Sequence, residues 1–133
     1  MGGHGALTLF LKNPGKYKSV SAFAPITNPS QCPWGNKAFS GYLGDDMEEW
    51  KKHDATELIK AWKGDFPCLI DVGRGDPFYK KGELLPENFE KAIKDAGING
   101  TTVRYHDDYD HGYFFVQSFA DDHIKHAAKA LGL

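Results

Sequence analysis

Two short segments of the sequence carry an acid and a base in the order of a hydrolytic triad. Asp76 closes the glycine-rich segment Gly73–Asp76, and His111 closes the segment Tyr109–His111. A histidine can accept a serine proton near neutral pH, and a carboxylate on its other ring nitrogen holds the tautomer and stabilises the imidazolium. Asp76 and His111 therefore predict nucleophilic catalysis by a serine hydroxyl.

The first five residues indicate where that hydroxyl belongs. Their sequence, Met-Gly-Gly-His-Gly, is similar to the second half of the nucleophile elbow G-x-S-x-G, in which the serine lies on a sharp turn between a strand and a helix. We therefore expect the serine directly before Met1, the backbone N–H of Met1 in the oxyanion hole, and no esterase activity from the chain alone. None of the serines present lies in an elbow pattern: Ser19, Ser21, Ser30, Ser40 and Ser118.

Simpler interpretations stay open at this level. Asp76 precedes a proline in a turn, where aspartate commonly bonds to the local backbone, and His111 could be a polar residue beside a helix start. The first glycines could bind phosphate or permit close packing.

Two groups of His and Asp side chains could suggest metal ligands. We interpret them as a solvated loop and a solvated helix face, and predict no metal or other cofactor. They are His106, Asp107, Asp108, Asp110 and His111, and Asp122, His123 and His126.

Strands and helices alternate along the chain. Predicted strands cover Lys18–Phe23, Pro67–Val72 and Thr101–Tyr105, and the second reads as a parallel strand buried on both faces. Predicted helices cover Gly2–Asn13, Ala55–Trp62, Pro86–Ala96 and Gly112–Leu131. This order is typical of an α/β fold with a parallel sheet and crossover helices, in which functional groups lie past the carboxyl ends of the strands. Asp76 and His111 both follow predicted strands.

The sequence also predicts a covering segment, a helix cap and the buried face of the last helix. Residues 26–44 hold two prolines and three glycines, and predict a loop-rich excursion with one short helix that can cover a site. Asp54 is placed to cap the helix that follows it, with Glu57 as the partner of a capping box. The last helix should bury one apolar face, made of Phe115, Phe119, Ile124, Ala127 and Leu131.

The composition fits one small domain over residues 1–133. Apolar residues make up 41% and charged residues 26%, and the formal net charge of -2 gives no reason to expect nucleic acid as a partner. The two cysteines, Cys32 and Cys68, suggest reduced thiols and not a disulfide framework. No apolar run is long enough for a membrane span, so we expect a cytosolic protein with a small-molecule substrate.

Several longer motifs resemble the S-formylglutathione hydrolase family, also called esterase D. They are Met1–Leu7, Lys12–Tyr17, Ser19–Pro25, Cys32–Gly35 and Tyr109–His111, so the resemblance runs from end to end of the chain. It implies the carboxyl-terminal portion of an α/β-hydrolase fold and a cytosolic serine thioesterase that converts S-formylglutathione to glutathione and formate in formaldehyde detoxification. It also places the family's triad acid on Asp76 and its histidine on His111.

The same resemblance implies that earlier strands of the sheet precede Met1. The strand at Lys18–Phe23 would then present an unpaired edge, and exposed edges recruit partners. We therefore expect a homo-oligomer, a swapped assembly or association with the missing amino-terminal half. The alternative interpretation is a non-catalytic α/β interaction module that uses this edge to bind another protein.

Overall fold

Three parallel strands form the sheet in the computed structural model, which describes residues 1–133. The strands β1 (Val20–Phe23), β2 (Cys68–Gly73) and β3 (Thr101–His106) lie in that order. Val20 pairs with Cys68, and Cys68 pairs with Thr101. All six residues of β2 are buried, as expected for the middle strand of a sheet covered on both faces. The predicted α/β class with a parallel sheet is confirmed.

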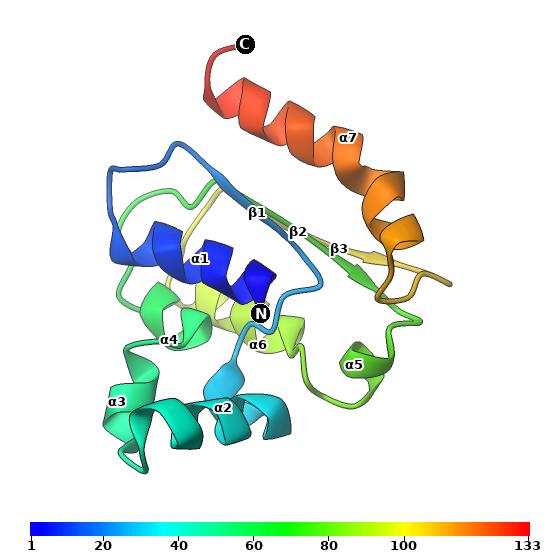
Figure 1. The fold of residues 1–133 in the computed structure, drawn as a ribbon. Helices are drawn as coiled ribbons and strands as arrows, with labels where there is room; N and C mark the ends of the chain where they lie inside the picture. Colours follow the sequence, from blue (N-terminus) through cyan, green and yellow to red (C-terminus); the bar gives the residue numbers. More distant parts are fainter.

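Helices cover both faces of this sheet (Figure 1). The helices α1, α4 and α6 lie on one face, and α7 crosses the other. A hydrophobic core of 17 buried residues fills the layers, with Leu7, Ile70 and Phe89 among its fully buried members. The helices are α1 (Gly2–Lys12), α2 (Pro33–Leu43), α3 (Met47–Lys51), α4 (Ala55–Ile59), α5 (Pro77–Lys80), α6 (Pro86–Asp95) and α7 (Tyr113–Ala130). None of them is both long and apolar enough to cross a bilayer.

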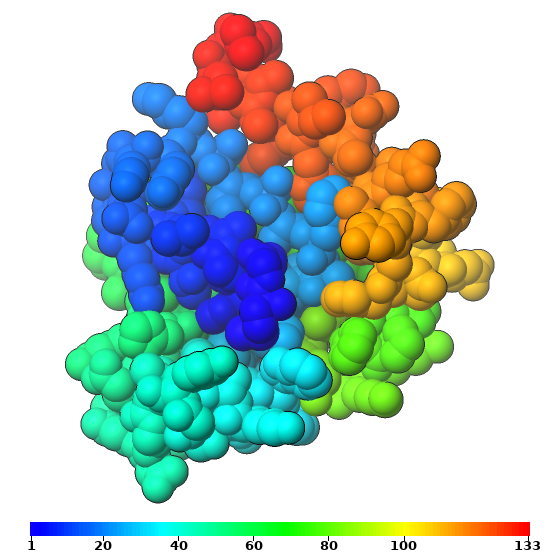
Figure 2. Space-filling view, viewed as in Figure 1, coloured from blue at the N-terminus to red at the C-terminus, as the bar shows by residue number.

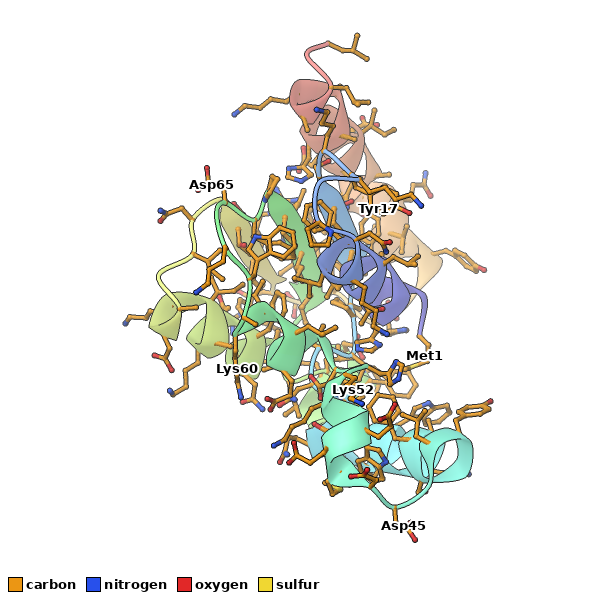
Figure 3. The ribbon with its side chains drawn as sticks, turned by 90° about the vertical axis from the view of Figure 1, so that its left-hand side faces the viewer. Met1, Tyr17, Asp45, Lys52, Lys60 and Asp65 are labelled. Atoms are coloured by element: carbon orange, nitrogen blue, oxygen red, sulfur yellow. The ribbon has the colours of Figure 1, made fainter.

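The excursion between β1 and α4 is more helical than the sequence predicts. It holds the 3-10 turn Pro29–Gln31, the eleven-residue helix α2 and the short helix α3. Cys32 caps α2, because its Sγ accepts a hydrogen bond from the Gly35 amide at 3.3 Å, and Pro33 fits the first turn. The prolines therefore begin helices here instead of excluding them. Figure 3 shows Asp45 at the tip between α2 and α3.

The cap of α4 is partly as predicted. Both the Thr56 and Glu57 amides donate to Asp54 Oδ1, at 2.9 and 3.2 Å. The reciprocal bond of a capping box is absent, since the Asp54 amide donates to the Lys51 carbonyl and the Glu57 carboxylate binds Lys60. Asp54 alone therefore satisfies the start of this helix.

The buried face of α7 differs from the predicted apolar face. Phe115 is buried and Phe119 is half-buried, as expected, but Ile124, Ala127 and Leu131 are exposed. The helix instead turns His123 and His126 toward the sheet, where they bond to Asp71 and to the Val20 carbonyl. The apolar pattern of the helix could not predict these inward histidines. They face the sheet because the surface that α7 covers includes the buried carboxylate of Asp71.

Candidate active site

Asp76 and His111 lie side by side past the carboxyl ends of β2 and β3. His111 Nδ1 is 2.7 Å from Asp76 Oδ2, and a carboxylate oxygen accepts, so this nitrogen donates. Asp76 also caps α5, since its Oδ1 accepts from the Phe78 amide at 2.7 Å. The Asp76 side chain is 0% exposed and that of His111 is 43% exposed. A buried, immobilised acid therefore holds an imidazole that remains open to a substrate.

A close backbone contact brings the two loops together. The Gly75 amide donates to the Tyr109 carbonyl at 2.9 Å, and the Arg74 amide donates to the His106 carbonyl at 2.8 Å. A Cβ on Gly73 would lie 2.2 Å from the Tyr109 carbonyl oxygen, so only glycine permits this approach. The glycines before Asp76 thus bring the acid within reach of His111.

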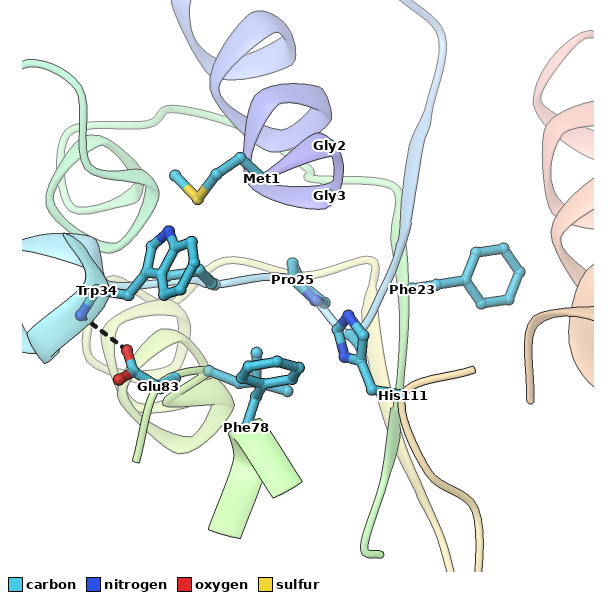
Figure 4. Close-up of a pocket in the computed structure, with 12 residues that line it drawn as sticks. Met1, Gly2, Gly3, Phe23, Pro25, Trp34, Phe78, Glu83 and His111 are labelled. Atoms are coloured by element: carbon cyan, nitrogen blue, oxygen red, sulfur yellow. Dashed lines mark hydrogen bonds between the residues drawn. The ribbon is translucent and has the colours of Figure 1, made fainter. Parts of the chain in front are cut away.

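His111 lines a pocket of about 260 Å³ at the amino end of α1. In Figure 4, the His111 ring lies on one side of this pocket, with Trp34 and Phe78 facing it and the first turn of α1 above. Figure 2 shows the hollowed face where the start of α1, the start of α2 and the loop before α7 meet. The lining is mostly apolar, and Glu83 is its one carboxylate. A small, uncharged group fits such a pocket best.

Glu83 and Phe78 fix two walls of the pocket. Glu83 Oε2 accepts from the Trp34 amide at 3.0 Å, which ties the start of α2 to the segment before α6. The Phe78 ring meets the His111 ring edge to face, with centroids 4.9 Å apart. Neither residue was identified from the sequence, because nothing in their spacing marks them before the loops are folded.

The start of α1 points at the same pocket. Met1, Gly2 and Gly3 line it, and α1 begins at Gly2, so the positive end of its dipole faces His111. A Cβ on Gly3 would lie 2.9 Å from Pro25 Cβ, which shows how closely this turn packs against the end of β1. The predicted oxyanion-hole residue and the predicted base thus line one pocket, and the predicted acid is buried against the base outside the lining.

The side chains in the two groups of potential metal ligands do not converge in the structure. No group of three or more His, Cys, Asp or Glu side chains in the structure has the geometry to hold a metal ion. His106 and His123, one from each group, instead bond to the buried carboxylate of Asp71, so the interpretation of the groups as solvated is wrong for these two side chains. The sequence signal for this network is a single charge, Asp71, inside the apolar run of β2.

Comparison with known proteins gives a consistent assignment. The Esterase family model matches residues 1–126. The chain is 54% identical to the S-formylglutathione hydrolase of Rattus norvegicus over 132 residues, and 52% identical to that of Arabidopsis thaliana over 134 aligned positions. These alignments cover 98% and 100% of the chain but 46% of each relative. The chain therefore spans about half the length of the curated relatives it matches.

Solved structures agree on the fold. An S-formylglutathione hydrolase from Agrobacterium tumefaciens superposes with a TM-score of 0.90 at 49% identity, covering 98% of the chain and 46% of that structure. Esterase B from Lactobacillus rhamnosis superposes with a TM-score of 0.70 at 12% identity, covering 98% of the chain and 50% of that structure. The second likeness shows a shared fold alone.

Proposed function

This chain belongs to the esterase family, and we propose that it supplies the acid, the base and the oxyanion-binding turn of a hydrolase that cleaves S-formylglutathione to glutathione and formate. The observation that carries the proposal is the 2.7 Å hydrogen bond between His111 and Asp76 beside the pocket at the start of α1. The high identity to proteins named for that activity supports the choice of substrate.

The proposed reaction follows the triad logic of serine hydrolases. A serine directly before Met1 in the complete protein attacks the thioester carbonyl, and His111 Nε2 accepts its proton. Asp76 keeps the opposite nitrogen protonated and stabilises the imidazolium. The Met1 N–H and the amino end of α1 stabilise the oxyanion, after which the glutathione thiol leaves with the proton from His111. Water then releases formate from the formyl-enzyme by the same steps.

The mostly apolar lining of the pocket supports an uncharged acyl group, and the choice of formyl rests on the names of the relatives. The volume of the pocket is about 260 Å³, and Trp34 and Phe78 form its walls. The proposal extends to formaldehyde catabolism and to short carboxylic esters, as the family resemblance implies.

We also propose a cytoplasmic location, which two free buried cysteines support. Burial raises the pKa of Cys32 to about 11, so its thiol stays protonated and unreactive.

A chimera tests the catalytic assignment. The amino-terminal part of the rat relative, ending in a serine, is joined ahead of Met1, and hydrolysis of S-formylglutathione is measured. We expect activity that His111→Ala lowers by about 10⁶-fold and that Asp76→Asn lowers by about 10⁴-fold.

The chain alone provides the matched control. Without a serine before Met1, residues 1–133 should hydrolyse p-nitrophenyl acetate only at the background rate. Saturable hydrolysis by the chain alone, abolished by His111→Ala, would contradict the assigned nucleophile. A folded chimera whose activity survives His111→Ala would contradict the assigned base.

A further inference from the structure

A further buried carboxylate, Asp71, belongs to the middle of β2, the strand that leads to Asp76. Its side chain is 0% exposed, and each of its two oxygens accepts two hydrogen bonds. Oδ1 accepts from Arg104 Nε at 2.6 Å and His106 Nε2 at 2.8 Å. Oδ2 accepts from Arg104 Nη2 at 2.7 Å and His123 Nε2 at 2.8 Å. This network, here called the Asp71 hub, uses no atom of the proposed reaction.

The donors of the Asp71 hub come from the two elements that flank His111. Arg104 and His106 belong to β3, and His106 is the last residue of that strand. His123 belongs to α7, which begins two residues after His111. Arg104 Nη1 also reaches Asp122 of α7 at 2.9 Å. One carboxylate therefore fixes both the strand that leads into the His111 loop and the helix that leaves it.

Stacked rings fix the two histidines of the hub. His106 stacks on Phe119 with centroids 3.7 Å apart, and His123 stacks on Phe23 at 3.8 Å. His123 Nδ1 is buried without a hydrogen-bond partner. A charged imidazole would place an unpaired N–H there, so the geometry favours neutral His123 that donates through Nε2.

The hydrogen bonds to Asp71 keep it ionised. Burial alone would raise its pKa, but the hydrogen bonds from His123, Arg104 and His106 hold the pKa well below its usual range. The same carboxylate raises the pKa of Arg104. The hub therefore presents a fixed acceptor to donors from both β3 and α7, and losing one donor loosens one end of the His111 loop.

We propose that Asp71 is a positioning residue for His111, acting through His106 and His123 to hold the loop that carries the catalytic base against Asp76. The proposal rests on the proposed function, because it assigns that role to His111. Asp71 bonds to neither Asp76 nor His111, so the proposed positioning acts through β3 and α7, which supply its hydrogen-bond donors.

The His111 Nδ1 proton provides a direct readout in the 133-residue chain. A proton shared with a carboxylate gives a downfield resonance in a spectrum of isotope-labelled histidine, and Asp76→Asn assigns it. We expect His123→Phe, which keeps the stack on Phe23 and removes the donor, to broaden or abolish this resonance in the folded chain. His123→Gln, which restores an N–H donor, should recover it, and Asp71→Asn should behave like His123→Phe.

Asp54→Asn is the matched control, because Asp54 is an equally buried carboxylate that binds Ser30 and Asn28 instead. We expect it to lower the free energy of unfolding and to leave the His111 resonance unchanged. An unchanged resonance in folded His123→Phe overturns the proposal, and so does its loss in folded Asp54→Asn. If Asp71→Asn does not fold, the His111 resonance in His123→Phe alone tests the proposal.

Kinetics of the chimera separate this proposal from the proposed function. His123→Phe should lower kcat by up to about 100-fold, the cost of a small misplacement of a catalytic group, while KM stays close to its original value. An inactive parent chimera would contradict the proposed function and leave the resonance result standing. A fall in activity with an intact resonance would contradict the positioning role.

Discussion

His4 shows at the scale of one residue how the fold around the site depends on a protonation state. It belongs to the first turn of α1, its ring is buried, and Nε2 lies 3.3 Å from the Ala55 amide, which donates to it. Burial lowers its pKa from 6.5 to about 4, and the nearby Asp54 carboxylate only partly opposes this. The folded chain therefore requires neutral His4.

The pKa of His4 predicts an acid-sensitive stability. The pKa of His4 is lower in the folded chain than in the unfolded chain. Its contribution to the free energy of unfolding is therefore complete above pH 6.5 and is lost as the pH falls toward about 4. The difference is on the order of 3 kcal/mol. His4→Gln keeps an acceptor for the Ala55 amide and cannot titrate, so its free energy of unfolding should depend less steeply on pH in that window. Equal slopes in urea titrations of both proteins would contradict this.

At the scale of one element, α7 combines two residues that the sequence pattern treated alike. Phe115 is 1% exposed and lies in the core, whereas Ile124 is 66% exposed. Phe115→Ala should lower the free energy of unfolding by about 3–5 kcal/mol because it leaves a cavity. Ile124→Ala removes exposed surface, so it should change stability by less than about 0.5 kcal/mol. Urea denaturation of both variants measures the difference, and similar losses would argue that α7 packs by its predicted apolar face.

At the scale of the whole molecule, both outer strands of the sheet have an unpaired edge, and exposed apolar side chains lie beside that of β1. The strand β1 pairs only with β2, and Leu9 and Tyr17 lie exposed beside it in a shallow groove. Free edges and apolar surface recruit partners. We predict that the 133-residue chain self-associates through this edge. Light scattering at high concentration should show a dimer or larger species.

Two exposed positions test the role of that edge. Leu9→Glu places a charge beside β1 and should shift the chain toward monomer. Tyr42→Glu is the control, since Tyr42 is exposed on α2 and Tyr42 does not line the groove beside β1. A compact monomer of the unsubstituted chain, or equal effects of the two charges, would count against association through β1.

The sequence by itself determined the order of elements and marked Asp76 and His111 as the proposed acid and base. Apolar runs, such as Cys68 to Val72, and breaks at glycine and proline are local, so β2, β3 and most helices could be predicted from them. Asp76 and His111 could be placed past neighbouring strands for the same reason. Their roles rested on chemistry and on the resemblance of short motifs.

Only the tertiary structure decided which side chains meet. The Gly73 contact with Tyr109, the Glu83 bond to Trp34 and the Asp71 hub all join segments that are distant in the sequence. A periodic pattern reports apolar surface, so it assigned Ile124 to the interior and missed His123. The physical reason is that a buried polar group is satisfied by a partner from another element, and no local pattern specifies that partner.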